Sequence, residues 1–402
     1  MKGRAGTYIR QPGGYRAFVP APLPPNPPVE VDLEIVRLLS EADQALGRLD
    51  GVTRILPEPD LFVAMYVLRE SVLSSQIEGT ISTLDDALVF ELQPNKPDLP
   101  KDVDEVVNHV RAMNYGLDRI DSFPLSLRLI REIHQELLSG VRGAEKQPGD
   151  FRSTQNWIGP GGAPLSQAAF IPPAPADMLA ALDNFEHFIR DDRELPALIH
   201  TGLAHAQFET IHPFLDGNGR VGRLLITFLL CHRQVLHRPL LYLSVYLRRH
   251  RAEYYDRLTA IREDGNWEGW LRFFLRGVKE TAEEAGKTAT AIVRLRDEHR
   301  KLAQDGGVGI HGLRLLDLLF ARPIVNVRFV KESLDVSFAT ANGLVDQFAT
   351  LALLTETTGQ QRNRIFRYGA YLDLFQEVLV AEEKAPVQTT LFVSEFSPQR
   401  AL

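Results

Sequence analysis

The chain has 402 residues, 44% hydrophobic and 24% charged, which is ordinary for a soluble protein with two or three domains. Its net charge of −7 argues against a general nucleic-acid binder, and its single cysteine, Cys231, excludes an internal disulfide. The start lacks the apolar core of a signal peptide, and no apolar run is long enough to span a bilayer. A cytoplasmic protein with no membrane partner and with Cys231 as a buried core thiol is therefore expected.

Residues 1–30 are expected to be irregular. The prolines of VPAPLPPNPPVEVD are too dense for a helix or a central strand. This segment is predicted to be an extended arm on the body of the protein, and a disordered tail is the alternative.

Helical periodicity begins at Asp32 and continues to about Glu91, because apolar residues recur every three or four positions. A helix ending at Gly79 is followed by STLDDALVFEL, in which Ser82 and Asp85 are spaced as a capping box. Two further helices are predicted over DVDEVVNHVRAMNYGLDRI and SLRLIREIHQELLSG.

Residues 143–177 break the helical pattern. Two β-prone runs, TQNWIG and AAFIPP, flank a Gly-Pro-Gly-Gly turn, which predicts a hairpin or flap over 156–172. Helices are then predicted over MLAALDNFEHFIRDD, LPALIHTGLAHAQFETI, GRVGRLLITFLLCHRQV, AEYYDRLTAIREDG and the long stretch that starts at WEGW.

The glycine-rich DGGVG at 305–309 predicts a linker. Three helical runs and a two-stranded wing follow, so a winged helix is expected over 305–383, with a flexible tail over 384–402. Seven Lys or Arg stand against six Asp or Glu from 306 to 376, and the expected recognition helix, 337–354, has no Lys or Arg. Because phosphate contacts need such residues, protein contact or dimerisation is favoured over DNA binding.

The stretch IHPFLDGNGRVGR, residues 211–223, lies between two predicted helices. Pro213 helps to end the first helix, and the second begins near Asn218. Gly217 and Gly219 let the backbone approach a ligand closely. The free N–H groups and the positive dipole end of the second helix favour an anion there.

Charged side chains around this helix start suit a polyphosphate. Arg220 and Arg223 are three residues apart and share one helix face. Asp216 can hold Mg²⁺ between phosphates, and His212 can accept a proton from an attacking hydroxyl. Each residue alone also fits an ordinary polar turn or helix face, but the combination favours phosphate chemistry.

The segment HPFLDGNGRVGR resembles the signature of Fic-domain proteins, His-Pro-Phe-x-(Asp or Glu)-Gly-Asn-(Gly or Lys)-Arg-x-x-Arg, at every fixed position. The helices from about Asp104 to Phe274 are also similar. The resemblance implies a mainly α-helical Fic-type bundle with a β-hairpin flap. It divides the chain into an N-terminal arm and inhibitory region (1–100), a Fic core (101–304) and the winged helix.

Most Fic proteins transfer AMP from ATP to a hydroxyl side chain of a target protein, so the resemblance implies a protein adenylyltransferase and leaves self-modification open. His212 would be the general base, and Asp216 would bind Mg²⁺. ATP and its phosphates would be bound by Gly217, Asn218, Gly219, Arg220, Val221, Gly222 and Arg223. The first three would form an anion hole, and the two arginines would hold the β- and γ-phosphates.

The segment SSQIEG, residues 74–79, ends a predicted helix and places Glu78 at the negative end of the helix dipole. Ser74, four residues earlier, faces the same way. A surface glutamate is one explanation, and a cationic partner is another. The segment resembles the inhibitory motif (Ser or Thr)-x-x-x-Glu-(Gly or Asn) of N-terminally autoinhibited Fic proteins. The resemblance implies that Glu78 pairs with Arg223 and blocks the γ-phosphate.

The resemblance also implies that an extended target segment pairs with the backbone of the flap, with Ile158 and Phe170 as clamp side chains. LSVYLRRHRAEYYDRL resembles the helix that borders the adenine pocket, but His250 stands where relatives often carry asparagine. His250 is thus a candidate nucleotide contact, and the choice of nucleotide stays open. Tyr254 and Tyr255 are expected in the core.

The expected function is an autoinhibited, Mg²⁺-dependent protein adenylyltransferase with ATP and a flap-docked target protein as partners. One alternative is a DNA-binding regulator whose Fic core senses nucleotide without catalysis, although the intact His212 and Asp216 argue against it. Another is a Fic enzyme that transfers a different nucleotide. The target, a homodimer and the signal that relieves Glu78 do not follow from the sequence.

Overall fold

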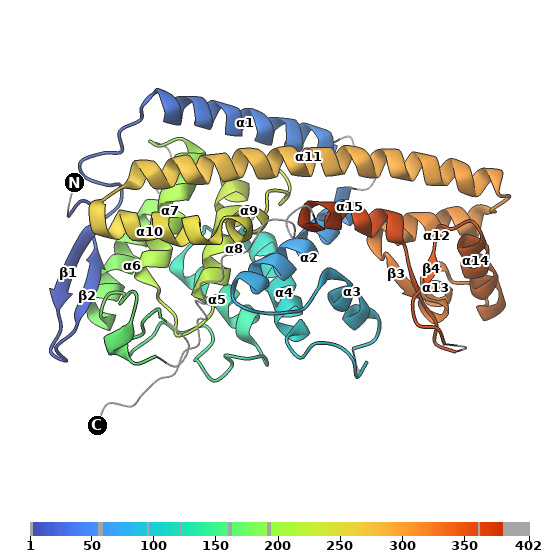
Figure 1. The fold of residues 1–402 in the computed structure, drawn as a ribbon, viewed down its shortest axis with the longest axis horizontal. Helices are drawn as coiled ribbons and strands as arrows, with labels where there is room; N and C mark the ends of the chain where they lie inside the picture. Colours follow the sequence, from blue (N-terminus) through green and yellow to red (C-terminus); the bar gives the residue numbers. More distant parts are fainter. Residues whose placement is uncertain are drawn as a thin grey trace.

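A computed structural model describes residues 3–54, 59–94, 96–120, 122–159, 163–190, 194–360 and 362–380. The described chain is mainly helical, as the sequence predicts, and Figure 1 shows the helices gathered along one long helix, α11. The elements are β1 (Gly6–Arg10), β2 (Arg16–Pro20), α1 (Leu33–Arg54), α2 (Pro59–Ile77), α3 (Leu84–Leu92), α4 (Val103–Ile120), α5 (Leu127–Leu138), a 3₁₀ turn (Leu165–Gln167), α6 (Pro175–Arg190), α7 (Ala197–Ile211), α8 (Asn218–His232), α9 (Ser244–Arg249), α10 (Arg251–Asp264), α11 (Trp267–Asp305), α12 (Ile310–Ala321), β3 (Ile324–Asn326), α13 (Val327–Leu334), α14 (Phe338–Thr350), β4 (Thr355–Glu356), β5 (Ile365–Arg367) and α15 (Gly369–Val380).

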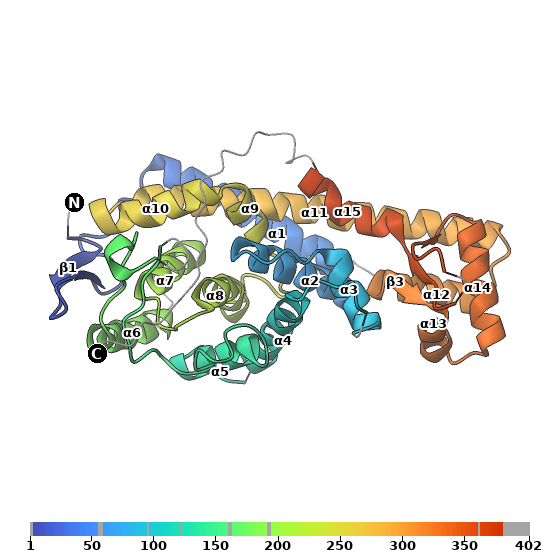
Figure 2. The same cartoon turned by 60° about the horizontal axis from the view of Figure 1, so that its bottom comes forward.

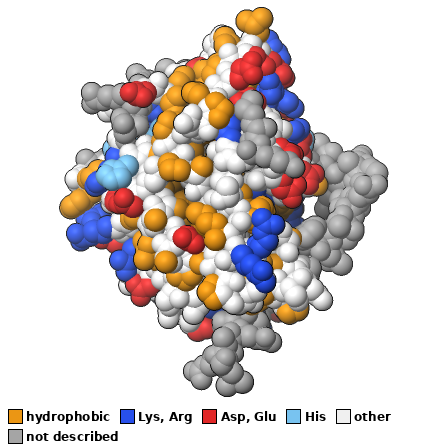
Figure 3. Space-filling model, turned by 90° about the vertical axis from the view of Figure 1, so that its left-hand side faces the viewer, with side chains coloured by type: hydrophobic (Ala, Val, Ile, Leu, Met, Phe, Trp, Pro, Cys, Tyr) orange, Lys and Arg blue, Asp and Glu red, His pale blue; other side chains and the backbone are white. Residues whose placement is uncertain are grey.

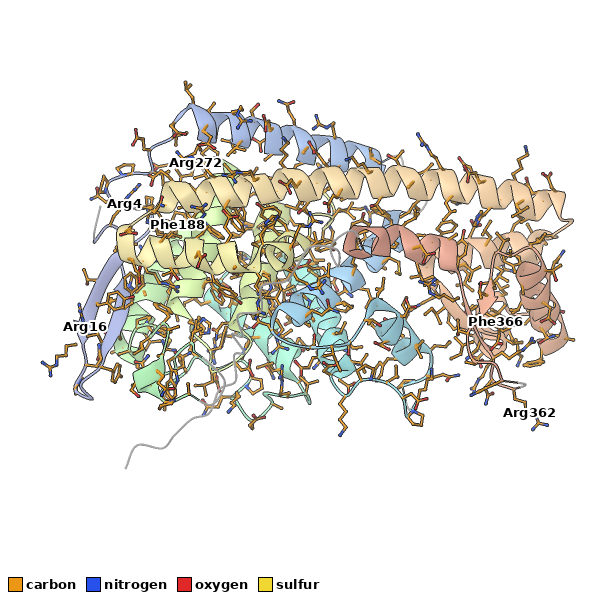
Figure 4. The ribbon with its side chains drawn as sticks, viewed as in Figure 1. Arg4, Arg16, Phe188, Arg272, Arg362 and Phe366 are labelled. Carbon is orange, nitrogen blue, oxygen red and sulfur yellow. The ribbon has the colours of Figure 1, made fainter. Side chains whose placement is uncertain are left out.

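Helix α11 has 39 residues and is therefore about 58 Å long at 1.5 Å per residue. The side chain of Asn266 caps its start by accepting the N–H of Gly269 at 2.9 Å. Figures 1 and 2 both show α1 lying alongside it. Figure 4 shows Arg272 where these two helices meet, and its guanidinium pairs with Glu34 at 2.8 Å.

Helices α7 and α8 occupy the middle of the bundle, where Figure 2 shows α8 end-on. Every residue from Leu198 to Ile211 is buried, and so is nearly all of α8. A helix that is buried all round must be enclosed by other helices, and α2, α4, α5 and α11 pack against this pair. The loop between α7 and α8 is therefore anchored at both ends by buried, closely packed helices.

The N-terminal segment differs from the expectation of irregular structure, because residues 6–20 form an antiparallel hairpin. Phe18 is buried and anchors it, while Tyr8 and Ile9 are exposed. Figure 3 shows hydrophobic side chains across this end of the molecule, with charges of both signs around them. The proline-rich segment that follows lies on the body of the protein, as expected, and the N–H of Leu23 donates to the Asn184 side chain at 2.8 Å.

The capping box of α3 is one residue later than predicted. Thr83 and Asp86 cap the helix reciprocally, while the Ser82 hydroxyl donates to Asp102. Cys231 is half-buried, so the expectation of a buried thiol is wrong. None of the helices in the described part of the chain combines the length and hydrophobicity of a membrane span.

The C-terminal elements follow the order helix, strand, helix, helix, strand, strand, with a sheet ordered β3-β5-β4. This order is compatible with the winged helix that the sequence predicts, although β3 and α15 were not anticipated. The predicted tail, 384–402, lies outside the described residues. These elements pack against α2 and α3, since the rings of Phe375 and Tyr66 are 5.4 Å apart and Arg367 pairs with Asp85 at 2.9 Å.

Candidate active site

The loop between α7 and α8 is closed by its own side chain, Asn218. Its Oδ1 accepts the N–H of Phe214 at 2.8 Å, and its Nδ2 donates to the Phe214 carbonyl at 2.9 Å. His212 ends α7 in the left-handed conformation (φ 50°), and Gly217 precedes α8 with φ 75°. The first amides of α8 have no acceptors within their own helix, so the loop frames the anion-binding helix end that the sequence predicts.

His134 of α5, which the sequence analysis did not single out, supports this loop. Its Nδ1 accepts the N–H of Gly149 at 2.8 Å, so its Nε2 carries the proton and donates to the Asp216 carbonyl at 3.0 Å. Its ring stacks on Phe214 with centroids 3.7 Å apart. Burial lowers the pKa of His134 to about 4, which keeps the imidazole neutral in this role.

Arg152 was also missed, and it ties the loop to the segment that leads into the flap. It is almost fully buried, and its guanidinium donates to the carbonyls of His212 at 3.0 Å and Pro173 at 2.6 Å. Asn156 adds a bond to the His212 carbonyl at 3.3 Å. The backbone of His212 is therefore fixed from outside its own helix.

The His212 side chain is buried, and this changes its expected titration. Burial, followed by the positive charge of Arg152, lowers the pKa of His212 to about 3. The near-neutral pKa that the sequence predicts for His212 is therefore wrong for this buried arrangement. The imidazole is neutral at physiological pH and can accept a proton.

Arg223 is buried and is held by residues 74–78, at the end of α2. Its Nη2 lies 2.8 Å from the Glu78 carboxylate and donates to the Ser74 carbonyl at 3.0 Å, while its Nε donates to Ser74 Oγ at 2.9 Å. Burial opposes ionisation of Glu78, but the charge and hydrogen bond of Arg223 together with nearby positive charge such as that of Arg220 outweigh it, so the pKa of Glu78 is lowered. Glu78, Ser74 and Arg223 are thus together, as the resemblance implies.

Glu78 covers the start of α8. A β-carbon at Gly219 would lie 2.2 Å from its Oε1, so the carboxylate fills the space in front of that residue. It thereby occupies the place where an anion would approach the helix end.

Arg220 is buried and has acidic partners of its own. Its Nη1 lies 3.0 Å from Glu105, and its Nη2 lies 3.6 Å from Asp216. Glu105, in the first turn of α4, was missed by the sequence analysis, and it also pairs with Arg142 at 3.1 Å. The side chain of Asp216 is about a quarter exposed and remains accessible to a ligand.

Val221 and Gly222 are packed inside the bundle, which does not fit the expectation that they bind phosphate. Val221 is fully buried, and its N–H donates to the Gly217 carbonyl at 3.0 Å. The Gly222 carbonyl lies 2.8 Å from Nδ1 of His205, whose Nε2 bonds to Tyr254 at 3.0 Å. Both residues therefore hold α8 against its neighbours.

Glu209, in the last turn of α7, is a further buried acid that the sequence analysis missed. Its Oε1 has no hydrogen-bond partner among the described residues and lies against Gly222, 2.3 Å from where a β-carbon would be. Burial raises the pKa of Glu209 to about 7, although the charge of Arg223 opposes the shift.

The predicted flap contains one antiparallel bridge, Ile158 to Phe170, with the Ile158 N–H 2.8 Å from the Phe170 carbonyl; residues 160–162 of its turn lie outside the described residues. The Phe170 ring is buried, with the Arg262 guanidinium 3.9 Å from its centre. A clamp role for Phe170 does not fit this burial. Ile158 is half-buried and keeps some free surface.

His250, the expected nucleotide contact, packs against Tyr246 with centroids 4.4 Å apart, and its ring also lies near Phe273, with centroids 6.5 Å apart. Tyr254 is buried as expected, whereas Tyr255 is 36% exposed and does not belong to the core. In the ranges that the structure describes, no three His, Cys, Asp or Glu side chains are grouped to hold a metal. A cation at Asp216 would need phosphate oxygens as further ligands.

Comparison with known proteins identifies this arrangement. The Fic/DOC family N-terminal model matches residues 36–118, and the Fic/DOC family model matches residues 124–230, including the loop and the start of α8. The chain contains a Fic domain. Two solved structures share its fold. A Fic family protein from Desulfovibrio desulfuricans has a TM-score of 0.54 at 17% identity, covering 85% of this chain and 97% of that one. A Fic domain containing signaling protein from Bacteroides thetaiotaomicron has a TM-score of 0.51 at 18% identity, covering 62% and 97%.

Curated relatives carry the name protein adenylyltransferase Fic. The protein from Drosophila grimshawi is 29% identical over 183 residues, which are 45% of this chain and 33% of that protein. The one from Culex quinquefasciatus is 30% identical over 161 residues, which are 40% and 28%. The matched part of the chain thus spans about a third of these relatives.

Proposed function

We propose that this Fic domain transfers AMP from ATP to a hydroxyl side chain of a target protein, and that Glu78 holds it in an inhibited state. The observation that carries the proposal is the 2.8 Å ion pair between Glu78 and Arg223 in front of the amides of α8. Similarity to proteins named adenylyltransferases supports it. Self-modification belongs to the same chemistry.

In the proposed reaction, neutral His212 takes the proton of the target hydroxyl. The hydroxyl oxygen then bonds to the α-phosphorus of ATP, the bond from that phosphorus to the β-phosphate oxygen breaks, and pyrophosphate leaves. The amides of Gly217, Asn218 and Gly219 and the two arginines neutralise the phosphates, which is the main requirement of phosphoryl-type transfer. Mg²⁺, held by Asp216 and phosphate oxygens, would supply further charge neutralisation.

Inhibition follows from two properties of Glu78. Its charge occupies the guanidinium that would bind a phosphate, and its carboxylate fills the space in front of Gly219. Glu78→Gly removes both obstacles, and Glu78→Gln removes only the charge. We expect AMP transfer in the order Glu78→Gly, then Glu78→Gln, then wild type, measured with labelled ATP on cell lysate and on the protein itself.

Two controls accompany this experiment. Gln76→Gly places a glycine in the last turn of α2 without touching Arg223, and it should leave transfer at the wild-type level. His212→Ala added to Glu78→Gly should reduce transfer by about 10²–10⁴-fold, the usual cost of a lost general base. Equal transfer by wild type and Glu78→Gly would contradict the inhibitory role, and no transfer by either would contradict the activity.

For the C-terminal elements we propose a winged helix that makes protein contacts. Two wing arginines are already neutralised, since Arg364 pairs with Asp346 at 3.2 Å and Arg367 pairs with Asp373 at 3.1 Å. Arg362, labelled in Figure 4, is exposed at the wing. A duplex titration at physiological salt should give no binding above a non-specific level, and tight binding would favour the DNA-binding regulator instead.

A further inference from the structure

The acid that holds Arg220 differs in setting from the acid that holds Arg223. Glu105 is the third residue of α4, where the helix dipole favours a negative charge. Its side chain is 5% exposed, against 21% for Glu78. A carboxylate so deeply enclosed with its cation is strongly disfavoured from separating, because both charges would stay buried and unpaired.

Glu105 is also held from its other side. The Nε of Arg142 lies 3.1 Å from its Oε1, while Oε2 faces Nη1 of Arg220 at 3.0 Å. Nη2 of Arg142 also donates to Oε2 at 3.3 Å, so Arg142 binds both carboxylate oxygens and shares Oε2 with Arg220. This arrangement fixes the orientation of the carboxylate and, through it, the plane of the Arg220 guanidinium.

Arg220 keeps donors for a ligand while Glu105 holds it. A guanidinium has five N–H groups, and only Nη1 is within hydrogen-bonding distance of Glu105. Nη2 has the longer 3.6 Å contact with Asp216, and Nε has no hydrogen-bond partner within the described residues. A phosphate can therefore bind Arg220 without displacing Glu105.

We propose that Glu105 is a positioning residue of the Fic domain, which holds Arg220 ready for the phosphate tail of ATP and stays in place when ATP binds. This inference rests on the proposed function. The proposed effects of Glu105 and Glu78 on phosphate binding are opposite. Removing Glu78 frees Arg223 to bind phosphate, whereas removing Glu105 leaves Arg220 without a fixed orientation.

Arg142 has a lesser part in the same arrangement. It is more than half exposed, and with Glu105, Gly79 and Thr80 it lines a cavity of about 370 Å³. Water in this cavity can replace the Arg142 guanidinium at the Glu105 carboxylate. Arg142→Gln should therefore weaken ATP binding less than Glu105→Gln does.

The test uses the full chain carrying Glu78→Gly, with and without Glu105→Gln. Binding of ATP and of AMP is measured by calorimetry, because only ATP carries the β- and γ-phosphates that Arg220 would contact. We expect Glu105→Gln to weaken ATP binding by about ten- to a hundredfold, the range for a lost charged hydrogen bond, and AMP binding less than about twofold. Glu132→Gln is the matched control, since Glu132 pairs with Arg119 of α4 at 3.2 Å away from the loop, and it should change neither affinity.

Three outcomes would overturn the inference: unchanged ATP affinity, an equal loss for ATP and AMP, or increased AMP transfer when Glu105→Gln is made with Glu78 intact. The second would mean a purely structural role, and the third a second inhibitory acid. If Glu105→Gln does not fold, Glu105→Asp takes its place, with a smaller but still ATP-selective loss expected. Absence of AMP transfer in the Glu78→Gly parent would count against the proposed function alone, because the binding measurements still decide the role of Glu105.

Discussion

Arg220 and Arg223 lie one helical turn apart on α8, and each is paired with a glutamate, but the two glutamates occupy opposite helix ends. Glu78 follows the last residue of α2, in a turn completed by Gly79 with φ 98°, where the helix dipole disfavours an acid. Glu105 lies in the first turn of α4, where the dipole favours one. The comparison teaches that similar ion pairs can differ in how readily they open, because backbone setting and exposure set the cost of separation.

The most direct way to break this comparison is to measure the free energy of unfolding. Glu105→Gln leaves Arg220 buried with only the distant Asp216 as an acidic partner, and losing one member of a buried pair costs about 3–5 kcal/mol. Glu78→Gln leaves Arg223 bonded to Ser74 and removes a partly exposed partner, so about 1 kcal/mol or less is expected. Urea denaturation of both variants gives the two values, and similar losses would end the distinction.

Glu209 sharpens the comparison as a third acid near α8, because it forms no ion pair with any of the residues that the structure describes. Its folded pKa, about 7, is raised above the usual 4.5, so ionisation destabilises the fold as the pH rises from about 4.5 to about 7. Glu209→Gln should therefore be more stable than the parent by up to about 3 kcal/mol at pH 8 and equally stable near pH 4. Melting curves across this range test it, and a gain at acidic pH instead would show that the carboxylate is stabilised by its surroundings.

A substitution of Ser74 has the smallest expected effect. It tests whether Ser74 positions Arg223 for ATP or contributes to inhibition together with Glu78. The hydroxyl and carbonyl of Ser74 accept from Arg223 without involving the Glu78 side chain, so we expect these bonds to persist when Glu78 is replaced. In the Glu78→Gly chain, Ser74→Ala should weaken ATP binding by about tenfold, which corresponds to one hydrogen bond to a charged group. A rise in ATP affinity would instead assign Ser74 to the inhibitory side.

Local patterns in the sequence predict much of this molecule. The helices, the helix start at Asn218 and the segment that ends at Glu78 each depend on residues within about a turn of one another. The overlapping pairs in STLDD, Ser82 with Asp85 and Thr83 with Asp86, show the limit of such patterns. Asp102 takes the Ser82 hydroxyl and so selects the second pair, and nothing within STLDD specifies that contact.

Three of the residues that sequence reasoning missed reach the site from distant parts of the chain. Glu105 is 115 positions from Arg220, His134 is 82 from Asp216, and Arg152 is 60 from His212. Only Glu105 leaves a local trace, as an acid on the buried face of α4. The N-terminal hairpin was missed because the prolines after it dominate the composition, although Gly13 and Gly14 mark its turn.

The bare backbone at Gly219 has a consequence for how the resting state is maintained. Because a single methyl group there would overlap the Glu78 carboxylate, the position of Glu78 in front of α8 depends on the missing side chain of Gly219 as well as on the ion pair with Arg223. The collision would fall on the free end of a flexible glutamate, so the carboxylate would give way and the helix would not. Under the proposed inhibition, the resting state therefore depends on two positions far apart in the chain, Glu78 and Gly219.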